Sequence, residues 1–367
     1  MREKIRVGIA GLGFGAEFIP IYQNHPQAEM YAICQRNPDS LHQIGEHFGV
    51  KVRYTSFEEM IQDDNIDAVH INTPIPDHAE QSIAALKAGK HVACTVPMAT
   101  SVEDCRRIVE AQQQSGKNYM MMETCVYTRE YLYVKHLRDT GKLGKIQFLR
   151  GAHQQEMAGW PGYWEGLPPM HYATHALSPL LALAEREAEY VMCLGSGQIA
   201  KELADKYGSP FAVESALFRL RDSNLAIEIT RSLFETSREY IESFDVYADR
   251  ISFEWQQLEG ESPVLFVGEQ AERVRVPDYA DRLPEGIRPY TTQGVYDLTD
   301  HVHLSFKQGS GHGGSHPHLA HEFLMSIVEN RPAFPDVYTS ANWTSAGICA
   351  HESAMQGGEK VFLPKFR

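Results

Sequence analysis

A glycine-rich turn near the N-terminus has the spacing of a phosphate-binding loop. The run GLGFGA at residues 11–16 fits the pattern G-x-G-x-x-G/A, and it directly follows an apolar run at residues 5–10. In this pattern one glycine permits a tight turn, another lets the backbone approach a pyrophosphate, and the last small residue lets helix and strand pack closely. The helix that begins here would direct its amides at negative charge. The sequence therefore predicts a dinucleotide site that includes Gly11, Gly13, Phe14 and Gly15.

The residues that follow the second apolar run, at 30–34, indicate which dinucleotide is bound. An acidic residue is expected roughly 20 residues after the glycine turn, but the segment here reads Ile33-Cys34-Gln35-Arg36-Asn37. The Gln35 amide can still bond a ribose hydroxyl, and the Arg36 guanidinium could meet a 2′-phosphate. NAD and NADP therefore both stay open as cofactors, with NAD slightly favoured.

A second group of residues could accept and hold a proton. Tyr172 and His175 are three positions apart and His171 is four before His175, so on a helix all three would share one face. Histidine titrates near neutral pH, which suits it to act as a general base. His312 lies in the run GHGG, whose glycines let the backbone approach a ligand closely. Packed core histidines are the alternative interpretation, and for His171 it is equally good.

The elements that must position these residues follow two patterns. Apolar runs near residues 5–10, 30–34, 68–72 and 91–96 alternate with helical periodicity, which requires a parallel sheet with helices on both faces. After about residue 125 long alternating segments predict an antiparallel sheet, and two helices, at 317–330 and 340–355, close the chain. We therefore predict an α/β fold, with a Rossmann domain at 1–125 and an α+β domain at 126–367 built on a large, mainly antiparallel sheet. The last helix could pack back on the Rossmann domain.

Composition excludes several classes of partner. The formal net charge is −14, from 48 acidic and 34 basic side chains, which disfavours nucleic acid and anionic membranes. No apolar run approaches the roughly 20 residues that span a bilayer, and the N-terminus lacks a signal-peptide pattern. Six scattered cysteines indicate reduced thiols. We expect a cytoplasmic protein that forms a homo-oligomer, a dimer, tetramer or larger, because the second sheet would expose one broad face.

The run INTPIPDHAEQSIAALKAGKHVACTVPMATSVEDCRRIVEA, residues 71–111, resembles the signature of the Gfo/Idh/MocA family of NAD(P)-dependent sugar and polyol oxidoreductases. With the glycine turn and the C-terminal strand pattern, the likeness covers essentially the whole chain. The resemblance implies that Thr73 and Pro74 lie along the cofactor, that His78 caps the following helix, and that Thr95 and Pro97 belong to the cofactor site.

Two motifs of that family are altered in this chain. Its Glu-Lys-Pro falls on Thr95-Val96-Pro97, and its Asp-x-x-x-His reads His171-Tyr172-Ala173-Thr174-His175. These departures resemble one branch, the NAD-dependent glycoside hydrolases of the α-N-acetylgalactosaminidase type and the related glycoside-oxidising enzymes. The segment MMMETCVYTREYLYVKHLRDTGKLGKI and the GHGG run look like that branch too.

The resemblance implies hydride transfer between a nicotinamide cofactor and a ring hydroxyl of a sugar or glycoside, with C3 the favoured position. Val96 cannot take the hydroxyl proton as the family's lysine does, so His175 becomes the expected base. A redox-neutral glycosidase that recycles its bound cofactor fits nearly as well. A non-catalytic sugar or cofactor sensor is the third interpretation.

Further residues are candidates for contact with a sugar. Glu123 and Tyr127 could orient it, although an ion pair and a core tyrosine explain them equally well. Aromatic residues of the run AGWPGYWEG could stack on a sugar face or anchor a loop. His316, His318 and His321 with other histidines could be imagined as a metal site, but no HExxH or cysteine-rich signature supports one, and we predict no metal. The catalytic candidates are His175, Tyr172, Glu123 and His312, and the substrate candidates are Tyr127, His153, Trp160, Trp164 and His171.

Overall fold

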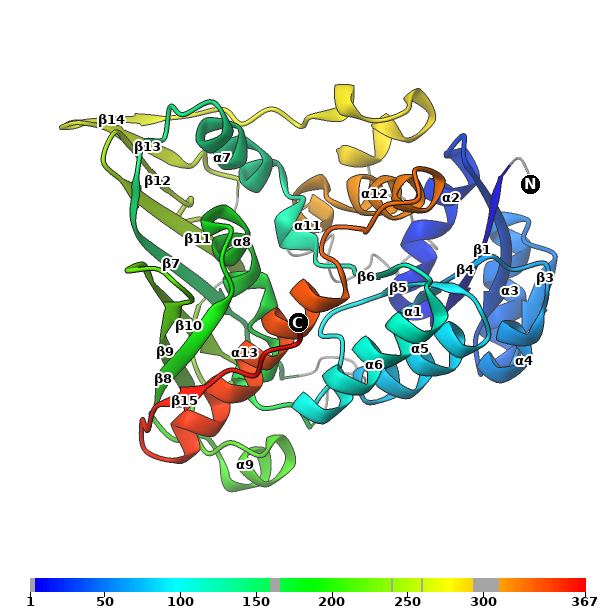
Figure 1. The fold of residues 1–367 in the computed structure, drawn as a ribbon, viewed down its shortest axis with the longest axis horizontal. Coiled ribbons are helices and arrows are strands. Elements are labelled where there is room, and N and C mark those ends of the chain that lie inside the picture. Colours follow the sequence, from blue (N-terminus) through cyan, green and yellow to red (C-terminus); the bar gives the residue numbers. More distant parts are fainter. Residues whose placement is uncertain (1–3, 159–165, 239, 259, 293–309) are drawn as a thin grey trace. The chain divides into compact units, whose positions relative to one another are not determined.

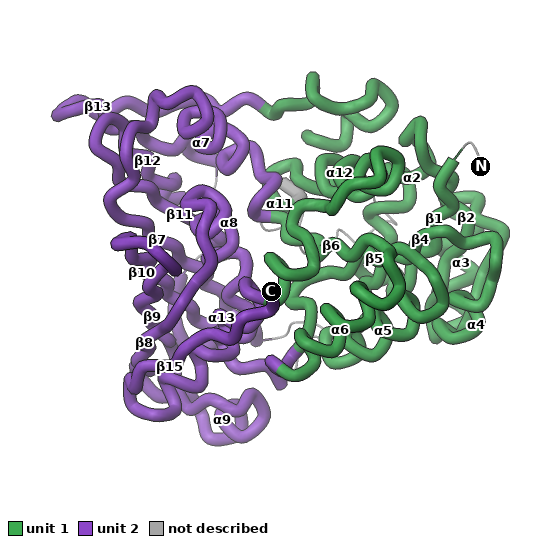
Figure 2. Tube along the Cα trace, in the orientation of Figure 1, with its two compact units in different colours: residues 1–99, 103–124, 278–341 green, residues 100–102, 125–277, 342–367 purple. Residues whose placement is uncertain are grey.

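The computed structural model describes residues 4–158, 166–238, 240–258, 260–292 and 310–367 (Figure 1). Contacts between Cα atoms divide the chain into two compact units (Figure 2). Unit 1 comprises residues 1–99, 103–124 and 278–341, and unit 2 comprises residues 100–102, 125–277 and 342–367. The sequence-based boundary at residue 125 lies beside the step between the units at 124/125. Residues 278–341, however, group with the N-terminal unit and not with the rest of 126–367.

Unit 1 is built on a six-stranded parallel sheet in the order β3-β2-β1-β4-β5-β6, the strand order of a dinucleotide-binding Rossmann fold. Its strands are buried by helices, which explains why they read as continuous apolar runs. The strands are β1 (Ile5–Ala10), β2 (Ala28–Cys34), β3 (Val52–Tyr54), β4 (Ala68–Ile71), β5 (His91–Cys94) and β6 (Tyr119–Met121). The helices between them are α1 (Leu12–Gly15), α2 (Ile19–Asn24), α3 (Pro38–Phe48), α4 (Phe57–Gln62), α5 (His78–Lys87) and α6 (Val102–Ser115), with the 3₁₀ turn η1 (Ala16–Phe18) before α2.

Local sequence fixes where these helices begin and end. The Asn37 side chain accepts the amides of Asp39 and Ser40 at the start of α3, and the helix ends at Gly49, whose φ of 68° is the left-handed conformation that glycine adopts readily. The Ser56 hydroxyl accepts the Glu59 amide at the start of α4, as its capping-box spacing predicts.

The late segment of unit 1 packs against the start of the chain. Helix α12 (His316–Val328) contacts α2 and η1, and it is preceded by α11 (Ser310–Gly314) and η7 (Glu285–Thr291). A Cβ atom at Gly286 would fall 2.5 Å from the carbonyl oxygen of Asn24, so a glycine is needed where η7 meets α2. The sequence predicted helix α12 from its periodicity, but periodicity does not say which sheet a helix covers.

Unit 2 is built on a nine-stranded sheet in the order β14-β13-β12-β11-β7-β10-β9-β8-β15. Every neighbouring pair is antiparallel except β7 and β10, which run parallel, so the predicted mainly antiparallel sheet is confirmed. The strands are β7 (Ile146–Gln154), β8 (Ala188–Ser196), β9 (Val213–Leu220), β10 (Ala226–Ser232), β11 (Ile241–Ala248), β12 (Ile251–Glu254), β13 (Val264–Val267), β14 (Gln270–Arg273) and β15 (Val361–Phe362).

Helix α8 (Thr174–Ala184) lies against β7, β10 and β11 on the face of this sheet that also carries α13 (Val337–Met355) (Figure 1). At Gly151 on β7, a Cβ atom would fall 2.5 Å from the carbonyl oxygen of Ala176. The absence of a side chain there lets the first turn of α8 approach the strand closely. The remaining helices of unit 2 are α7 (Arg129–Asp139) and α9 (Lys201–Tyr207).

The strands also present large apolar side chains to solvent. Met192 and Leu194 on β8, Leu217 on β9 and Phe362 on β15 are 48%, 60%, 54% and 65% exposed. Met192 pairs directly with Leu217 across the two strands. These four residues, the exposed strip, therefore lie on neighbouring strands. Among the described residues, no helix is both long enough and apolar enough to cross a membrane.

Candidate cofactor and catalytic sites

The glycine turn after β1 has the geometry that a dinucleotide requires. Gly11 has φ 83°, and a Cβ atom there would fall 2.3 Å from the carbonyl oxygen of Asn72. At Gly15 a Cβ atom would fall 2.8 Å from Cγ2 of Ile9. Helix and strand therefore pack most closely at Gly15, one residue before Ala16, the last small residue of the pattern. At Gly13 no described residue has an atom within 4 Å of a Cβ atom. The turn therefore packs tightly against the protein at Gly11 and Gly15. It leaves space at Gly13, the position that the pattern assigns to the pyrophosphate.

The turn is tied to the end of β2 by Gln35. Its side-chain oxygen accepts the Leu12 amide at 3.4 Å, and the Gly11 amide donates to the carbonyl of Cys34 at 3.0 Å. Gln35 is half-buried and Arg36 is exposed. Gln35 thus helps to fix the turn, while the Arg36 side chain faces solvent.

His78 connects the loops that follow β4 and β5. It is fully buried, and its ring lies 2.8 Å through Nδ1 from the carbonyl oxygen of Pro97 and 2.9 Å through Nε2 from that of Thr73. The family resemblance implied a helix cap, but the residue before it, Asp77, occupies the N-cap position of α5. His78 therefore fixes the backbone at Thr73 and Pro97, two of the residues predicted to line the cofactor site.

The partners of His78 require a protonated ring. Both carbonyl oxygens can only accept, so both ring nitrogens must donate. The Thr95 hydroxyl, 3.4 Å from Nε2, already donates to the carbonyl of Ile71 and cannot satisfy an unprotonated nitrogen. Burial alone would lower the pKa of His78, but Cys94 and the two carbonyls raise it from 6.5 to about 9.

We expect this proton to make stability depend on pH. A folded-state pKa above the unfolded value gives stability that is complete below pH 6.5 and is lost as the pH rises towards about 9. The free energy of unfolding should fall by at most about 3 kcal/mol over that range, and His78→Gln should flatten the slope in denaturant titrations. His70→Gln is the control, because burial lowers the pKa of His70 to about 3, outside this range. An equal slope in wild type and His78→Gln would contradict the assignment.

In unit 2 the predicted residues His153, Tyr172 and His175 lie together. The ring nitrogen Nε2 of His175 lies 3.1 Å from the Tyr172 hydroxyl, and the ring centroid of His153 lies 5.6 Å from that of His175 and 5.8 Å from that of Tyr172. All three side chains are buried. Burial, together with the positive charge of Arg231, holds the pKa of His153 well below its ordinary value, so His153 is neutral.

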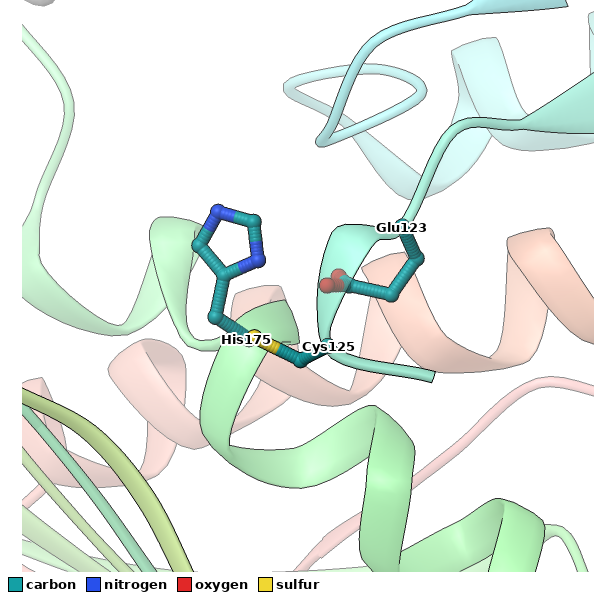
Figure 3. Close-up of side chains that lie close together, drawn as sticks. All are labelled: Glu123, Cys125 and His175. Atoms are coloured by element: carbon teal, nitrogen blue, oxygen red, sulfur yellow. The ribbon is translucent and has the colours of Figure 1, made fainter. Parts of the chain in front are cut away.

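A carboxylate lies between these rings. Oε1 of Glu242 on β11 is 3.7 Å from Nε2 of His153 and 3.7 Å from Nε2 of His175. Oε1 also accepts the hydroxyl of Tyr240, and Oε2 accepts the Cys125 thiol at 3.4 Å. Figure 3 shows Cys125 and His175, whose Sγ and ring nitrogen lie within 4.8 Å of each other.

A buried cation completes the group. The guanidinium of Arg231 on β10 donates to the carbonyls of His153 at 3.1 Å and Ser232 at 2.7 Å, and to Oε1 of Gln155 at 2.8 Å. It lies 5.9 Å from the centre of the Tyr172 ring. Burial lowers its pKa to about 10, which still leaves it charged at neutral pH. The histidine–glutamate cluster of unit 2 consists of Cys125, His153, Tyr172, His175, Arg231, Tyr240 and Glu242.

Other predicted residues lie elsewhere. Tyr172 ends the 3₁₀ turn η5 (Pro169–Tyr172) and His175 lies in α8, so His171 does not share a helix face with His175. The His171 ring instead packs edge-on against His351 at 5.4 Å, and burial lowers its pKa to about 3. This contradicts the predicted one-face arrangement, because the backbone turns more tightly before Thr174 than in an α-helix.

Of the remaining candidates, some lie in unit 1, one lies in unit 2, and two lie outside the described residues. Glu123 is buried directly after β6 in unit 1 (Figure 3), and Tyr127 is half-buried just after η3 (Thr124–Val126) in unit 2. The His312 ring lies against Phe14 and His316, with centroid distances of 6.1 and 5.5 Å. Trp160 and Trp164 lie outside the described residues.

Sequence reasoning missed Cys125, Arg231, Tyr240 and Glu242. A signal existed for two of them. Arg231 follows Ile227 and Ile229 in the inward register of β10, and Glu242 precedes Phe244 and Val246 in that of β11. A charged residue in the apolar register of a strand has to be paired inside the protein, and it is a candidate for a site.

Comparison with known proteins bears on the fold of both units. Residues 5–123 match the family model described as the oxidoreductase family with an NAD-binding Rossmann fold, GFO_IDH_MocA. This segment has the sequence signature of the Gfo/Idh/MocA family. The resemblance stated from residues 71–111 is therefore confirmed, as is the prediction of an NAD-binding oxidoreductase fold.

Relatives extend the likeness over the whole chain. The alpha-N-acetylgalactosaminidase of Shewanella oneidensis is 24% identical over 99% of this chain and 85% of its own length. The structure of levoglucosan dehydrogenase in complex with NADH covers 99% of this chain and 100% of its own, at 20% identity and a TM-score of 0.78. Scyllo-inositol dehydrogenase from Lactobacillus casei, with bound NAD(H) and scyllo-inositol, covers 98% and 99%, at 19% identity and a TM-score of 0.74. These two structures share the fold of this chain.

Proposed function

We propose that this chain transfers hydride between NAD and a ring hydroxyl of a sugar or glycoside, with C3 the favoured position. The observation that carries the proposal is the buried His175, whose Nε2 lies 3.1 Å from the Tyr172 hydroxyl and 3.7 Å from the Glu242 carboxylate. Such a ring can accept a proton and has a negative charge beside it. The sugar dehydrogenases and the glycosidase among the relatives support the substrate class.

The residues have the chemistry that such a reaction needs. When bound, the nicotinamide accepts the hydride of the carbinol carbon, and the hydroxyl proton has to leave with it. Val96, at the family's lysine position, is buried and cannot take a proton. His175 is the proposed acceptor, and Tyr172 is the proposed hydrogen-bonding partner that keeps the imidazole oriented. Glu123, His312 and Tyr127 stay candidates for contacts with the substrate.

A redox-neutral glycosidase is the second candidate. It is favoured by the similarity to the Shewanella oneidensis alpha-N-acetylgalactosaminidase, which extends over nearly the whole chain. In that reaction the same base would take the hydroxyl proton, and the C3 ketone would make the C2 proton acidic. Loss of that proton would expel the aglycone with the electron pair of its C–O bond, water would add in its place, and the hydride would then return to C3.

One assay separates these possibilities. A panel of nitrophenyl glycosides and free sugars is incubated with the purified full-length chain and NAD or NADP, with and without EDTA, since we propose that no metal is needed. Reduced cofactor and released aglycone are followed together. Accumulating NADH supports the dehydrogenase, and aglycone release without net reduction supports the glycosidase. Tight cofactor binding without either reaction would overturn both and leave a sensor.

We favour NAD over NADP because Gln35 lies at the glycine turn, where it can reach a ribose hydroxyl. If NADP is bound instead, the exposed Arg36 is the residue that would bind its 2′-phosphate. Comparison of the two cofactors in the same assay decides between them.

The exposed strip supports assembly as a homo-oligomer, a dimer, tetramer or larger. Four large apolar side chains on neighbouring strands would be covered if two copies of the sheet packed together. Light scattering at micromolar concentration should give at least twice the mass of 41.4 kDa. Leu194→Lys with Leu217→Lys should lower that mass, whereas Leu258→Lys, at another exposed leucine, should not. A monomer of the unaltered protein would refute the proposal.

We place the protein in the cytoplasm. All six cysteines are buried and free, which suits a reducing compartment. Fluorescence microscopy of the tagged chain checks this.

A further inference from the structure

We propose that Glu242 is a positioning residue that stabilises the protonated ring of His175 and thereby determines the pH range in which the site accepts a proton. The inference deepens the proposed function and rests on it for its kinetic consequences. The effect of Glu242 on the pKa of His175 involves only side chains of unit 2, and it can be measured without a substrate.

The Glu242 carboxylate lies close to the His175 ring and is buried. Oε1 of Glu242 lies 3.7 Å from Nε2 of His175, and the Glu242 side chain is only 8% exposed. Water therefore screens the pair weakly, and a negative charge at this distance favours the protonated imidazole.

Two hydrogen-bond donors hold the Glu242 carboxylate as an acceptor. The Tyr240 hydroxyl and the Cys125 thiol both donate to it, one to each carboxylate oxygen. Burial and the neighbouring Glu242 raise the pKa of Tyr240 well above its ordinary value, so the phenol keeps its proton. The protonated phenol and the thiol hydrogen bond stabilise the charged carboxylate and fix its orientation.

His153 lies as close to Oε1 of Glu242 as His175 does, but its surroundings differ. The backbone carbonyl of His153 is bonded to the guanidinium of Arg231, and burial with that positive charge disfavours a second cation there. His153 therefore stays neutral, and His175 is the ring that can take up the charge.

Nε2 of His175 lies near both the Tyr172 hydroxyl and the Glu242 carboxylate, and its protonation decides which of them it bonds. Without a proton it accepts from the Tyr172 hydroxyl at 3.1 Å, and with a proton it can donate towards Glu242. Within unit 2, the titratable and charged groups that face His175 are Tyr172, His153, Glu242 and Cys125, with Arg231 behind Tyr172.

In the oxidation, the carbinol loses its C–H and O–H bonds and becomes a carbonyl. The hydride and its electron pair go to NAD, and the proton ends on Nε2 of His175. Glu242 compensates the charge that this proton brings into a buried site. Its role resembles that of any buried carboxylate that stabilises an imidazolium formed during catalysis.

The decisive variant is Glu242→Gln, which keeps the size of the side chain and an oxygen that can accept from Tyr240, but removes the charge. We expect the acid limb of the kcat profile to move down by about one pH unit or more, with kcat on the plateau at least about tenfold lower and KM little changed. Glu242→Asp, which keeps the charge, should restore the position of the limb.

A matched control is Glu254→Gln. Glu254 on β12 of the same sheet also accepts a tyrosine hydroxyl, that of Tyr247 at 2.9 Å, but lies outside the cluster. Its loss should leave the acid limb in place. An unshifted limb in Glu242→Gln, or an equal shift in Glu254→Gln, overturns the proposal.

A second measurement does not depend on turnover. The titration of the His175 ring is followed by NMR in the full chain with labelled histidine, assigned by comparison with His175→Gln. The pKa of His175 should be lower in Glu242→Gln and higher in Tyr240→Phe, which removes a donor from the carboxylate. Because the two variants should shift the pKa of His175 in opposite directions, either one tests the role of Glu242 if the other does not fold. Unchanged titration in the folded variants overturns the role of Glu242, whereas shifted titration without turnover of any sugar overturns the proposed function alone.

Discussion

Replacing His175 by alanine is expected to lower turnover by roughly 10²–10⁴-fold while leaving NAD affinity nearly unchanged. The imidazole is buried beside Tyr172 and Glu242, where it can take the hydroxyl proton in the transition state, but it lies in unit 2 and outside the dinucleotide-binding turn. Tyr172→Phe should lose less, because the ring and its packing are kept. Val96→Lys should not rescue His175→Ala, since the lysine would replace a buried valine and its charge would have to be taken out of water.

Steady-state kinetics and calorimetric titration with NAD test this prediction. His171→Ala is the control, because His171 lies in the same segment but packs against His351 and not in the histidine–glutamate cluster. Its turnover should stay near wild type if the variant is folded. If His175→Ala kept near wild-type turnover on the true substrate with an unchanged pH dependence of kcat, the base would have to be sought at Glu123 or His312.

Replacing Gly13 by aspartate is expected to abolish dinucleotide binding without unfolding the protein. The Cβ position at Gly13 is free of described atoms within 4 Å, so the side chain fits. Its carboxylate would then stand where the pattern brings a pyrophosphate, and the two negative charges repel. Calorimetric titration measures the binding, and thermal unfolding without cofactor checks that the fold is kept.

Two further variants of the same turn distinguish binding from folding. Gly13→Ala adds volume without charge and should weaken binding less. Gly11→Ala should lower the unfolding temperature as well, because φ is 83° and the new Cβ atom would fall 2.3 Å from the Asn72 carbonyl. Unchanged NAD affinity in Gly13→Asp would mean that the turn is structural and that the Rossmann unit binds no dinucleotide there.

The sequence was sufficient to predict the parallel sheet and the glycine turn, because each depends on neighbours in the chain. Alternating apolar runs and helices leave few sheet topologies, and the steric need for glycine at position 11 follows from a local pattern. The same pattern placed the close packing of helix and strand at Ala16, whereas the structure places it at Gly15. Tyr172 and His175 do lie together, as predicted, but they meet across the step from η5 to α8 and not on one helix face.

The rest of the cluster could not be predicted in this way. His153, Arg231 and Glu242 come from β7, β10 and β11, which adjoin only because β7 runs between the other two. Their meeting depends on strand order and register, and alternation within one strand specifies neither. His171 was misplaced because a 3₁₀ turn precedes α8, and a spacing of four residues means a shared face only within one α-helix.

The contact between Gly151 and the first turn of α8 links activity to a position that takes no part in the chemistry. The Ala176 carbonyl that approaches this glycine belongs to the residue after His175, so any side chain at position 151 would displace the proposed base from Glu242 on the neighbouring strand. In a set of homologous or laboratory-evolved sequences, residue 151 should then vary together with the pH optimum and not with substrate preference. A change at this position would adjust the catalytic rate while every member of the histidine–glutamate cluster keeps its identity.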